Sequence, residues 1–120
     1  MGGPILVIDD EPAVLRLLAL VLDDFGYEVY AAPDAESALT ALESMRPEVI
    51  VSDVKLPGID GTEFVRRVRA TEGISSIPVI LVSAYDEPAD HAADRFVRKP
   101  LDPMELADVV RDASQISVSR

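Results

Sequence analysis

Hydrophobic residues along the chain come in short runs of Val, Ile and Leu, which alternate with longer stretches where apolar positions recur every three or four residues. A continuous apolar run such as residues 4–8 is typical of a strand buried on both faces of a sheet. On this basis we predict strands at residues 4–8, 28–31, 49–52, 78–82 and 95–98.

The stretches between these runs have helical spacing and helical end signals. One helix is expected to begin at Pro12 and to stop before Gly26. Asp34 can cap a second helix, and residues 102–105 are similar to a capping box with proline at the first helical position. We therefore predict helices at residues 12–25, 34–44, 61–71 and 102–114.

Strands that alternate with helices predict one α/β domain, in which a five-stranded parallel sheet carries helices on both faces. We expect this domain to span residues 1–114 and residues 115–120 to form a polar tail or the start of a linker. In such sheets, binding sites form beyond the carboxyl ends of the strands. The residues that directly follow each apolar run are therefore the candidates for chemistry.

The composition narrows the class of protein. A chain of 120 residues suffices for one packed core, and its 22 acidic against 11 basic residues give a net charge of −11. This charge repels phosphate backbones, so we expect no direct binding to nucleic acid. The absence of a long apolar run or a secretion signal argues against a membrane protein and favours a cytoplasmic one. Without cysteine, disulfides and thiolate metal sites are excluded.

Acidic side chains follow two of the predicted strands. Asp9 and Asp10 come directly after the first strand, and Asp53 follows the third. The predicted sheet brings these carboxylates together at one edge. Carboxylates close to one another raise each other's pKa or require a cation, and oxygen ligands of this kind suit Mg²⁺. Helix capping is the simpler interpretation for either Asp9 or Asp10 alone, and solubility explains much of the remaining acidic charge.

A hydroxyl and an ammonium group are predicted at the same edge. Ser83 follows the fourth strand and Lys99 follows the fifth. Each is unremarkable alone, but beside the carboxylates they predict a phosphoryl-transfer site. Asp53 would attack phosphorus, the metal and Lys99 would offset the developing charge, and Ser83 would hold the product. The single histidine, His91, is interpreted as a surface residue.

Taken in order, these motifs resemble the receiver (CheY-like) domains of two-component response regulators, a family with a flavodoxin-like (βα)5 fold. The resemblance covers nearly the whole chain and rests on four segments: residues 8–11 (IDDE), 52–61 (SDVKLPGIDG), 82–84 (VSA) and 96–100 (FVRKP). It implies a signalling domain that catalyses only its own phosphorylation and dephosphorylation. A sensor histidine kinase or a phosphotransfer protein would supply the phosphoryl group, and a downstream effector or a fused output domain would receive the signal.

The resemblance also implies roles for single residues around the metal. Asp53 would be the phospho-acceptor, and Asp10 and Asp53 would bind Mg²⁺ or Mn²⁺ directly. Asp9 would act through a water molecule, and Lys55 would contribute its backbone carbonyl.

Further implied roles concern the phosphoryl group and the switch. Lys99 would contact the phosphoryl group, and the bond from Lys99 to Pro100 would be a cis peptide. Ser83 would move toward the phosphate, and the Phe96 ring would follow it.

This chain departs from the family between its last two strands. Residues 85–95 are too few for the usual helix, and Pro88 restricts them further, so we predict a helical stub near Pro88 or an irregular segment. We expect this segment to be the most mobile internal part and to become ordered on phosphorylation. Lys55 and Tyr85 would flank the path of an attacking water and affect the lifetime of the phosphate.

Two alternatives belong to other classes. An aspartyl phosphatase of the haloacid dehalogenase type would place its nucleophile after the first strand in an Asp-x-Asp pattern, whereas Asp9 and Asp10 are adjacent. A degenerate receiver that acts only as a binding module would lack key side chains, and this chain has them all.

Overall fold

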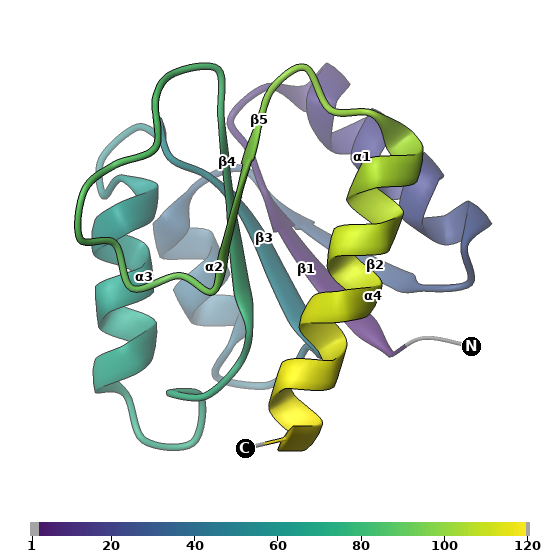
Figure 1. Ribbon diagram of the computed structural model, residues 1–120. Coiled ribbons are helices and arrows are strands. Elements are labelled where there is room, and N and C mark those ends of the chain that lie inside the picture. Colours follow the sequence, from purple (N-terminus) through teal and green to yellow (C-terminus); the bar gives the residue numbers. More distant parts are fainter. Residues whose placement is uncertain (1–2, 120) are drawn as a thin grey trace.

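The structure is a computed structural model that describes residues 3–119. Five strands form one parallel sheet in the order β2-β1-β3-β4-β5 (Figure 1). The strands are β1 (Pro4–Ile8), β2 (Glu28–Ala32), β3 (Val49–Asp53), β4 (Val79–Ser83) and β5 (Arg95–Arg98). These bounds agree with the predicted strands to within one residue and confirm the parallel sheet.

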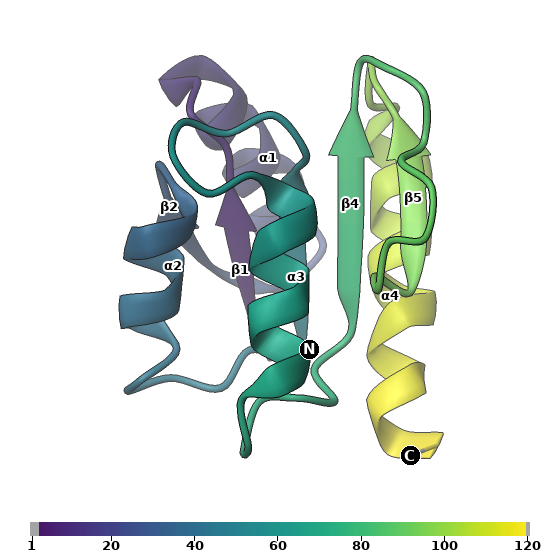
Figure 2. The same cartoon turned by 90° about the vertical axis from the view of Figure 1, so that its left-hand side faces the viewer.

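Helices cover both faces of the sheet, as predicted. They are α1 (Pro12–Asp24), α2 (Ala35–Ala41), α3 (Gly61–Ala70) and α4 (Pro103–Ser119). Helices α2 and α3 lie on one face, and α1 and α4 lie on the other (Figures 1 and 2). Successive residues of β1 point to opposite faces, so Leu6 packs in the core beneath α2 and α3, while Val7 packs beneath α1 and α4.

Two helix ends differ from the predictions. Helix α2 ends at Ala41 rather than at Ser44, and the Arg46 guanidinium donates to the carbonyl of Leu42, just beyond the helix. Helix α4 continues to Ser119, past the predicted end at Ser114, because Ile116 still packs against the core on that face. The division into a domain and a tail at this point remains a prediction.

The connection between β4 and β5 contains no helix in residues 84–94, all of which are described. Of the two predicted outcomes, the irregular segment is the one observed, and the described chain has four helices instead of the five expected for a (βα)5 domain. Pro88 disfavours a helix here because it lacks an amide proton, and the φ of 56° at Asp90 lies outside the right-handed helical region.

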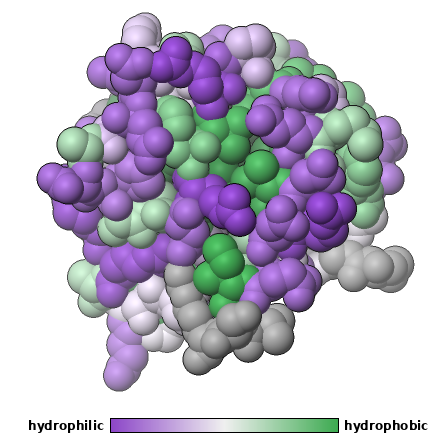
Figure 3. All heavy atoms as spheres, viewed as in Figure 1, coloured by the Kyte–Doolittle hydropathy of each residue, from purple (hydrophilic) through white to green (hydrophobic). Residues whose placement is uncertain are grey.

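Most of the molecular face drawn in Figure 3 is hydrophilic, with hydrophobic side chains gathered along its middle, over β5 and its border with α4. A polar surface of this kind agrees with the strong net charge of the chain. Among residues 3–119, none of the helices combines the length and the apolar character needed to cross a bilayer.

Candidate functional site

The pairing of the strands places the predicted carboxylates side by side. Ile8 pairs with Ser52, so the residues that follow them in the chain, Asp9 and Asp53, lie next to each other. One carboxylate oxygen from each of Asp9, Asp10 and Asp53 lies within 4.8 Å of the others. Asp9 is fully buried, Asp53 is 7% exposed, and Asp10 faces solvent. The cluster therefore opens outward through Asp10.

Backbone amides hold the two buried carboxylates in place. The Glu11 amide donates to Asp9 Oδ1 at 2.9 Å, and the Lys55 amide donates to Asp53 Oδ1 at 3.2 Å. Each amide lies two residues beyond its carboxylate, the pattern of an Asx turn that follows a strand end. These bonds leave the other oxygen of each group, Oδ2, directed to the rest of the site.

Lys99 joins these two oxygens. Its Nζ lies 3.0 Å from Asp9 Oδ2 and 3.1 Å from Asp53 Oδ2. The Lys99 amide donates to the Ser83 carbonyl at 2.8 Å, which extends the pairing of β5 with β4 up to this residue. The Lys99 side chain is 18% exposed, and the two carboxylates stabilise its charge in this enclosed place.

Burial and charge shift two pKa values at the site. Burial raises the pKa of Asp53 above its ordinary value and the Asp9 charge adds to this, whereas the hydrogen bond and charge of Lys99 act in the opposite direction. Burial alone would lower the pKa of Lys99, but hydrogen bonds to Asp9 and Asp53 outweigh it and leave that pKa raised. Lys99 is therefore charged throughout the physiological range.

The donor set fits a hard divalent cation. Three carboxylates from two strand ends can present an oxygen each to one point, and Mg²⁺ prefers oxygen ligands together with water. The outward-facing Asp10 gives such an ion access to solvent for its water ligands. Lys55 lies beside the cluster, held by the hydrogen bond that its backbone amide donates to the Asp53 carboxylate.

The predicted switch residues lie on the neighbouring strands. Ser83 ends β4, is 1% exposed, and its Oγ accepts a hydrogen bond from the Tyr85 amide at 3.0 Å. Phe96 lies on β5 and packs against the core beneath α2 and α3, so the structure does not bring it into the acidic cluster. The peptide bond between Lys99 and Pro100 is cis.

His91 is not the surface residue that we predicted. Its side chain is only 10% exposed, and its Nε2 lies 2.6 Å from Glu87 Oε2. The His91 and Phe96 rings are 6.5 Å apart, and His91 Nδ1 accepts from the Ala93 amide. Without a helix in this segment, the chain folds back and covers the ring, which the spacing of residues along the sequence does not reveal.

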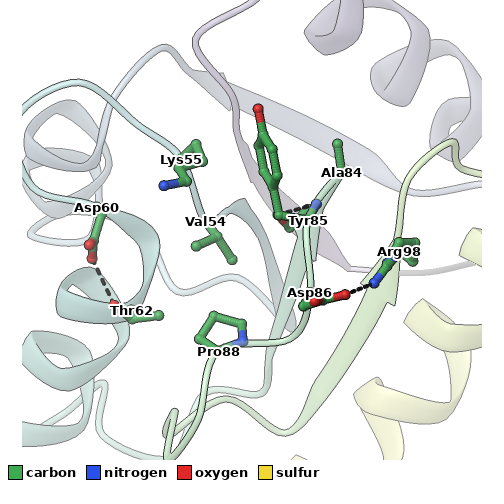
Figure 4. A pocket seen from close by; sticks show the side chains of 10 residues that line it. Val54, Lys55, Asp60, Thr62, Ala84, Tyr85, Asp86, Pro88 and Arg98 are labelled. Atoms are coloured by element: carbon green, nitrogen blue, oxygen red, sulfur yellow. Dashed lines mark hydrogen bonds and ion pairs between the residues drawn. The ribbon is translucent and has the colours of Figure 1, made fainter.

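A hollow of about 830 Å³ lies beside the acidic cluster, between the start of α3 and the β4–β5 segment (Figure 4). At its rim, Lys55 Nζ lies 5.6 Å from the centre of the Tyr85 ring, which is a cation–π distance. On the β4–β5 side of the hollow, Asp86 forms an ion pair with Arg98. The sequence pointed to Lys55 and Tyr85 as flanking residues, and the structure shows them in contact with each other.

Comparison with known proteins identifies a family. Residues 5–111 match the family model described as the response regulator receiver domain. The DNA-binding response regulator MtrA of Mycolicibacterium smegmatis is 34% identical over 117 residues, which are 92% of this chain and 50% of that protein. PhoP, the alkaline phosphatase synthesis transcriptional regulatory protein of Bacillus subtilis, is 37% identical over 112 residues. The match covers 88% of this chain and 46% of PhoP, so the chain spans about half the length of both regulators.

A solved structure has the same fold and a bound metal. The receiver domain of sensor histidine kinase PA1611 from Pseudomonas aeruginosa PAO1, solved with a magnesium ion coordinated in its active-site cleft, has a TM-score of 0.88 and 26% identity. The alignment covers 96% of this chain and 99% of that domain.

The family match settles the class of protein. Receiver domains pair with histidine kinases in two-component signalling, and they are signalling modules, which sets aside the phosphatase hypothesis. The pocket of Asp9, Asp10 and Asp53 is the phosphorylation pocket of such a domain. With its flavodoxin-like sheet and this pocket, the chain belongs to the response regulator receiver domain family.

Proposed function

We propose that this domain takes a phosphoryl group from a phosphohistidine onto the Asp53 carboxylate and thereby switches a surface that a partner recognises. The observation that carries the proposal is the bridge from Lys99 Nζ to both Asp9 and Asp53 inside the three-carboxylate cluster. A structural role alone does not require a partly buried lysine to contact two carboxylates, nor a third, exposed carboxylate beside them on the solvent side.

In the proposed transfer, a carboxylate oxygen of Asp53 attacks phosphorus. An O–P bond forms, the P–N bond of the phosphohistidine breaks, and the imidazole leaves with the electron pair and takes up a proton. Lys99 Nζ, already 3.1 Å from Asp53 Oδ2, is placed to offset charge on the phosphoryl oxygens. The Ser83 hydroxyl, at the end of the adjacent strand, would donate to a phosphoryl oxygen of the product.

Mg²⁺, or Mn²⁺ in its place, is the cation that we propose for the cluster. Asp10 and Asp53 would bind it directly, Asp9 would bind it through water, and Lys55 would add its backbone carbonyl. When bound, the ion supplies positive charge that stabilises the transferring phosphoryl group.

The switch that we propose uses two residues on adjacent strands. Ser83 would turn toward the phosphoryl group and give up its bond from the Tyr85 amide. Phe96 on β5, which pairs with Leu81 of β4 and lies beside His91, would then change its packing. The signal would reach the surface through the β4–β5 segment, which is irregular in this domain.

The proposed partners follow from this role. The donor would be a sensor histidine kinase or a phosphotransfer protein in the cytoplasm, and the recipient would be a separate effector or a fused output domain. A net charge of −11 supports the view that this domain does not itself bind nucleic acid.

Phosphorylation by a small donor tests the proposal. With Mg²⁺ and acetyl phosphate, intact-mass measurement is expected to show one added phosphoryl group on the wild type and none on Asp53→Asn. Asp60→Asn is the matched control, because Asp60 is an exposed carboxylate that caps α3 beside the hollow. Equal phosphorylation of the wild type and Asp53→Asn would contradict the assignment.

We also expect Mg²⁺ to stabilise the fold, and to do so less after Asp10→Ala. A ligand that binds only the native state at 100 times its dissociation constant adds about 2.7 kcal/mol to the free energy of unfolding. Removal of one carboxylate relieves repulsion, so the metal-free variant should be at least as stable as metal-free wild type. Thermal melts with and without Mg²⁺ measure both effects.

Glu11→Ala is the control for this measurement. Glu11 is the next exposed carboxylate along the chain, and its side chain makes no capping bond at α1. Its metal response should match that of the wild type. If Asp10→Ala responded equally, Asp10 would not be a ligand, and a wild type that shows no response would favour a degenerate receiver.

A further inference from the structure

Helix α3 begins unusually close to the backbone of Asp53. A Cβ atom on Gly61, the first residue of α3, would lie 2.9 Å from the Val54 Cα and closer still to the Asp53 carbonyl oxygen. The φ of Gly61 is not in the left-handed region, so its backbone conformation suits any L-residue. Glycine is therefore required here by the proximity of Asp53 and not by the turn.

The same carbonyl is held by a hydroxyl group. Ser52, fully buried in β3, donates from Oγ to the Asp53 carbonyl oxygen at 2.9 Å. The helix start limits the movement of this carbonyl through Gly61, and the hydroxyl restrains its orientation. Because the carboxylate of Asp53 is attached to the same residue, a shift of this carbonyl moves the carboxylate.

Gly61 also closes the loop that carries Lys55. The Gly61 amide donates to the Val54 carbonyl at 2.8 Å, so the loop of residues 54–60 begins and ends at one point. Inside this loop, the Lys55 amide donates to Asp53 Oδ1. A side chain at position 61 would push the helix start, the loop and Asp53 apart.

We propose that Gly61 and Ser52 are positioning residues, which set the location of the Asp53 carboxylate and of the Lys55 backbone carbonyl. This inference rests on the proposed function for the reaction, but its geometric part concerns the free domain. A displacement of about 1 Å can cost about a hundredfold in the rate of a group transfer. An alanine at the start of a helix would otherwise favour folding, so a loss of function would come from the contact with Asp53.

The test compares Gly61→Ala and Ser52→Ala with Val68→Ala, which removes a buried side chain of α3 away from Asp53. Three quantities are measured: the rate of phosphorylation by acetyl phosphate, the Mg²⁺ dissociation constant by calorimetry, and amide hydrogen exchange of residues 54–60 without metal. Gly61→Ala should phosphorylate at least about tenfold more slowly, bind Mg²⁺ more weakly and exchange faster in the loop. Ser52→Ala should change in the same direction by a smaller factor.

Val68→Ala separates positioning from loss of stability. At a temperature where every variant is folded, its phosphorylation rate and Mg²⁺ affinity should equal those of the wild type. Gly61→Ala values within about twofold of the wild type would overturn the proposal. If Gly61→Ala does not fold, Ser52→Ala decides, and wild-type rate, affinity and exchange in that variant would overturn it.

A failure of the proposed function can be told apart from a failure of this positioning proposal. A wild type that takes up no phosphoryl group would contradict the proposed reaction. The Mg²⁺ affinity and the metal-free exchange of the loop would still decide whether Gly61 and Ser52 position Asp53 and Lys55.

Discussion

Replacement of Lys99 by methionine is expected to lower the metal-free free energy of unfolding by about 3 kcal/mol at neutral pH. Lys99 Nζ bonds to Asp9 and Asp53, which are 0% and 7% exposed. Without the ammonium group, two neighbouring buried carboxylates have no opposite charge between them. Methionine retains most of the apolar stem, so the loss comes from the charge and not from a cavity.

The loss of unfolding free energy in Lys99→Met should become smaller as the pH falls. Burial already raises the pKa of Asp53, and removal of Lys99 takes away the strongest influence that lowers it. For a carboxyl whose pKa is higher in the folded state, the folded protein binds more protons, so stability falls as pH rises from the unfolded pKa through the folded one. Lys99→Met and wild type should therefore differ most at neutral pH and converge in acid. Mg²⁺ should also restore part of the stability, because it provides the missing charge.

Chemical denaturation at several pH values, with and without Mg²⁺, measures these effects. Lys55→Met is the matched control, since Lys55 is exposed and its ammonium group lies over the Tyr85 ring instead of between carboxylates. It should change stability by no more than about 0.5 kcal/mol at any pH. An equal loss in both variants, or a Lys99→Met loss that does not depend on pH, would show that Lys99 does not neutralise the site.

The sequence predicted the sheet and the acidic cluster because both depend on simple patterns. Strands buried on both faces are continuously apolar, so runs such as residues 79–82 mark them clearly. In a parallel sheet the residues after these runs meet at one edge, which places Asp9 and Asp53 together without any knowledge of the tertiary structure.

Contacts that no pattern along the chain signals explain what the sequence did not predict. The cover over His91 comes from a segment without regular structure, for which no residue spacing is characteristic. Nor does the sequence signal the close approach of Gly61 to Asp53, because a glycine that follows an aspartate is equally typical of a tight turn. Nor did the sequence indicate that Arg69 of α3 would reach a residue 25 positions further along the chain.

That residue is Asp94, and its replacement by alanine is expected to cost about 2–3 kcal/mol and to loosen the β4–β5 segment. Asp94 Oδ2 accepts from Arg69 Nη2 at 2.8 Å and from the Val79 amide at 2.9 Å, in a place where its side chain is 13% exposed. Arg69 also donates to the carbonyls of Ala92 and Ile77. The pair therefore joins α3, the start of β4 and the end of the irregular segment.

This tether refines the expectation that residues 85–95 are the most mobile internal part of the domain, which remains a prediction. Because the segment is anchored at Asp94, the half near Tyr85 is the part with freedom to become ordered when Asp53 is phosphorylated. Hydrogen exchange of wild type should show the amides of residues 85–87 exchanging faster than those of residues 92–94. In Asp94→Ala, this difference should disappear and the Val79 amide should lose its protection, while the amides of residues 80–83 stay protected.

Asp86→Ala is the control for the tether, because Asp86 belongs to the same segment but its side chain is 96% exposed and pairs with Arg98 at the surface. An exposed ion pair contributes at most about 1 kcal/mol, so this variant should keep both its stability and the protection of residues 92–94. If Asp94→Ala were as stable and as protected as Asp86→Ala, the Arg69–Asp94 pair would not hold the segment. Other contacts of the segment would then protect residues 92–94, and the ion pair would not decide which half of residues 85–95 becomes ordered on phosphorylation.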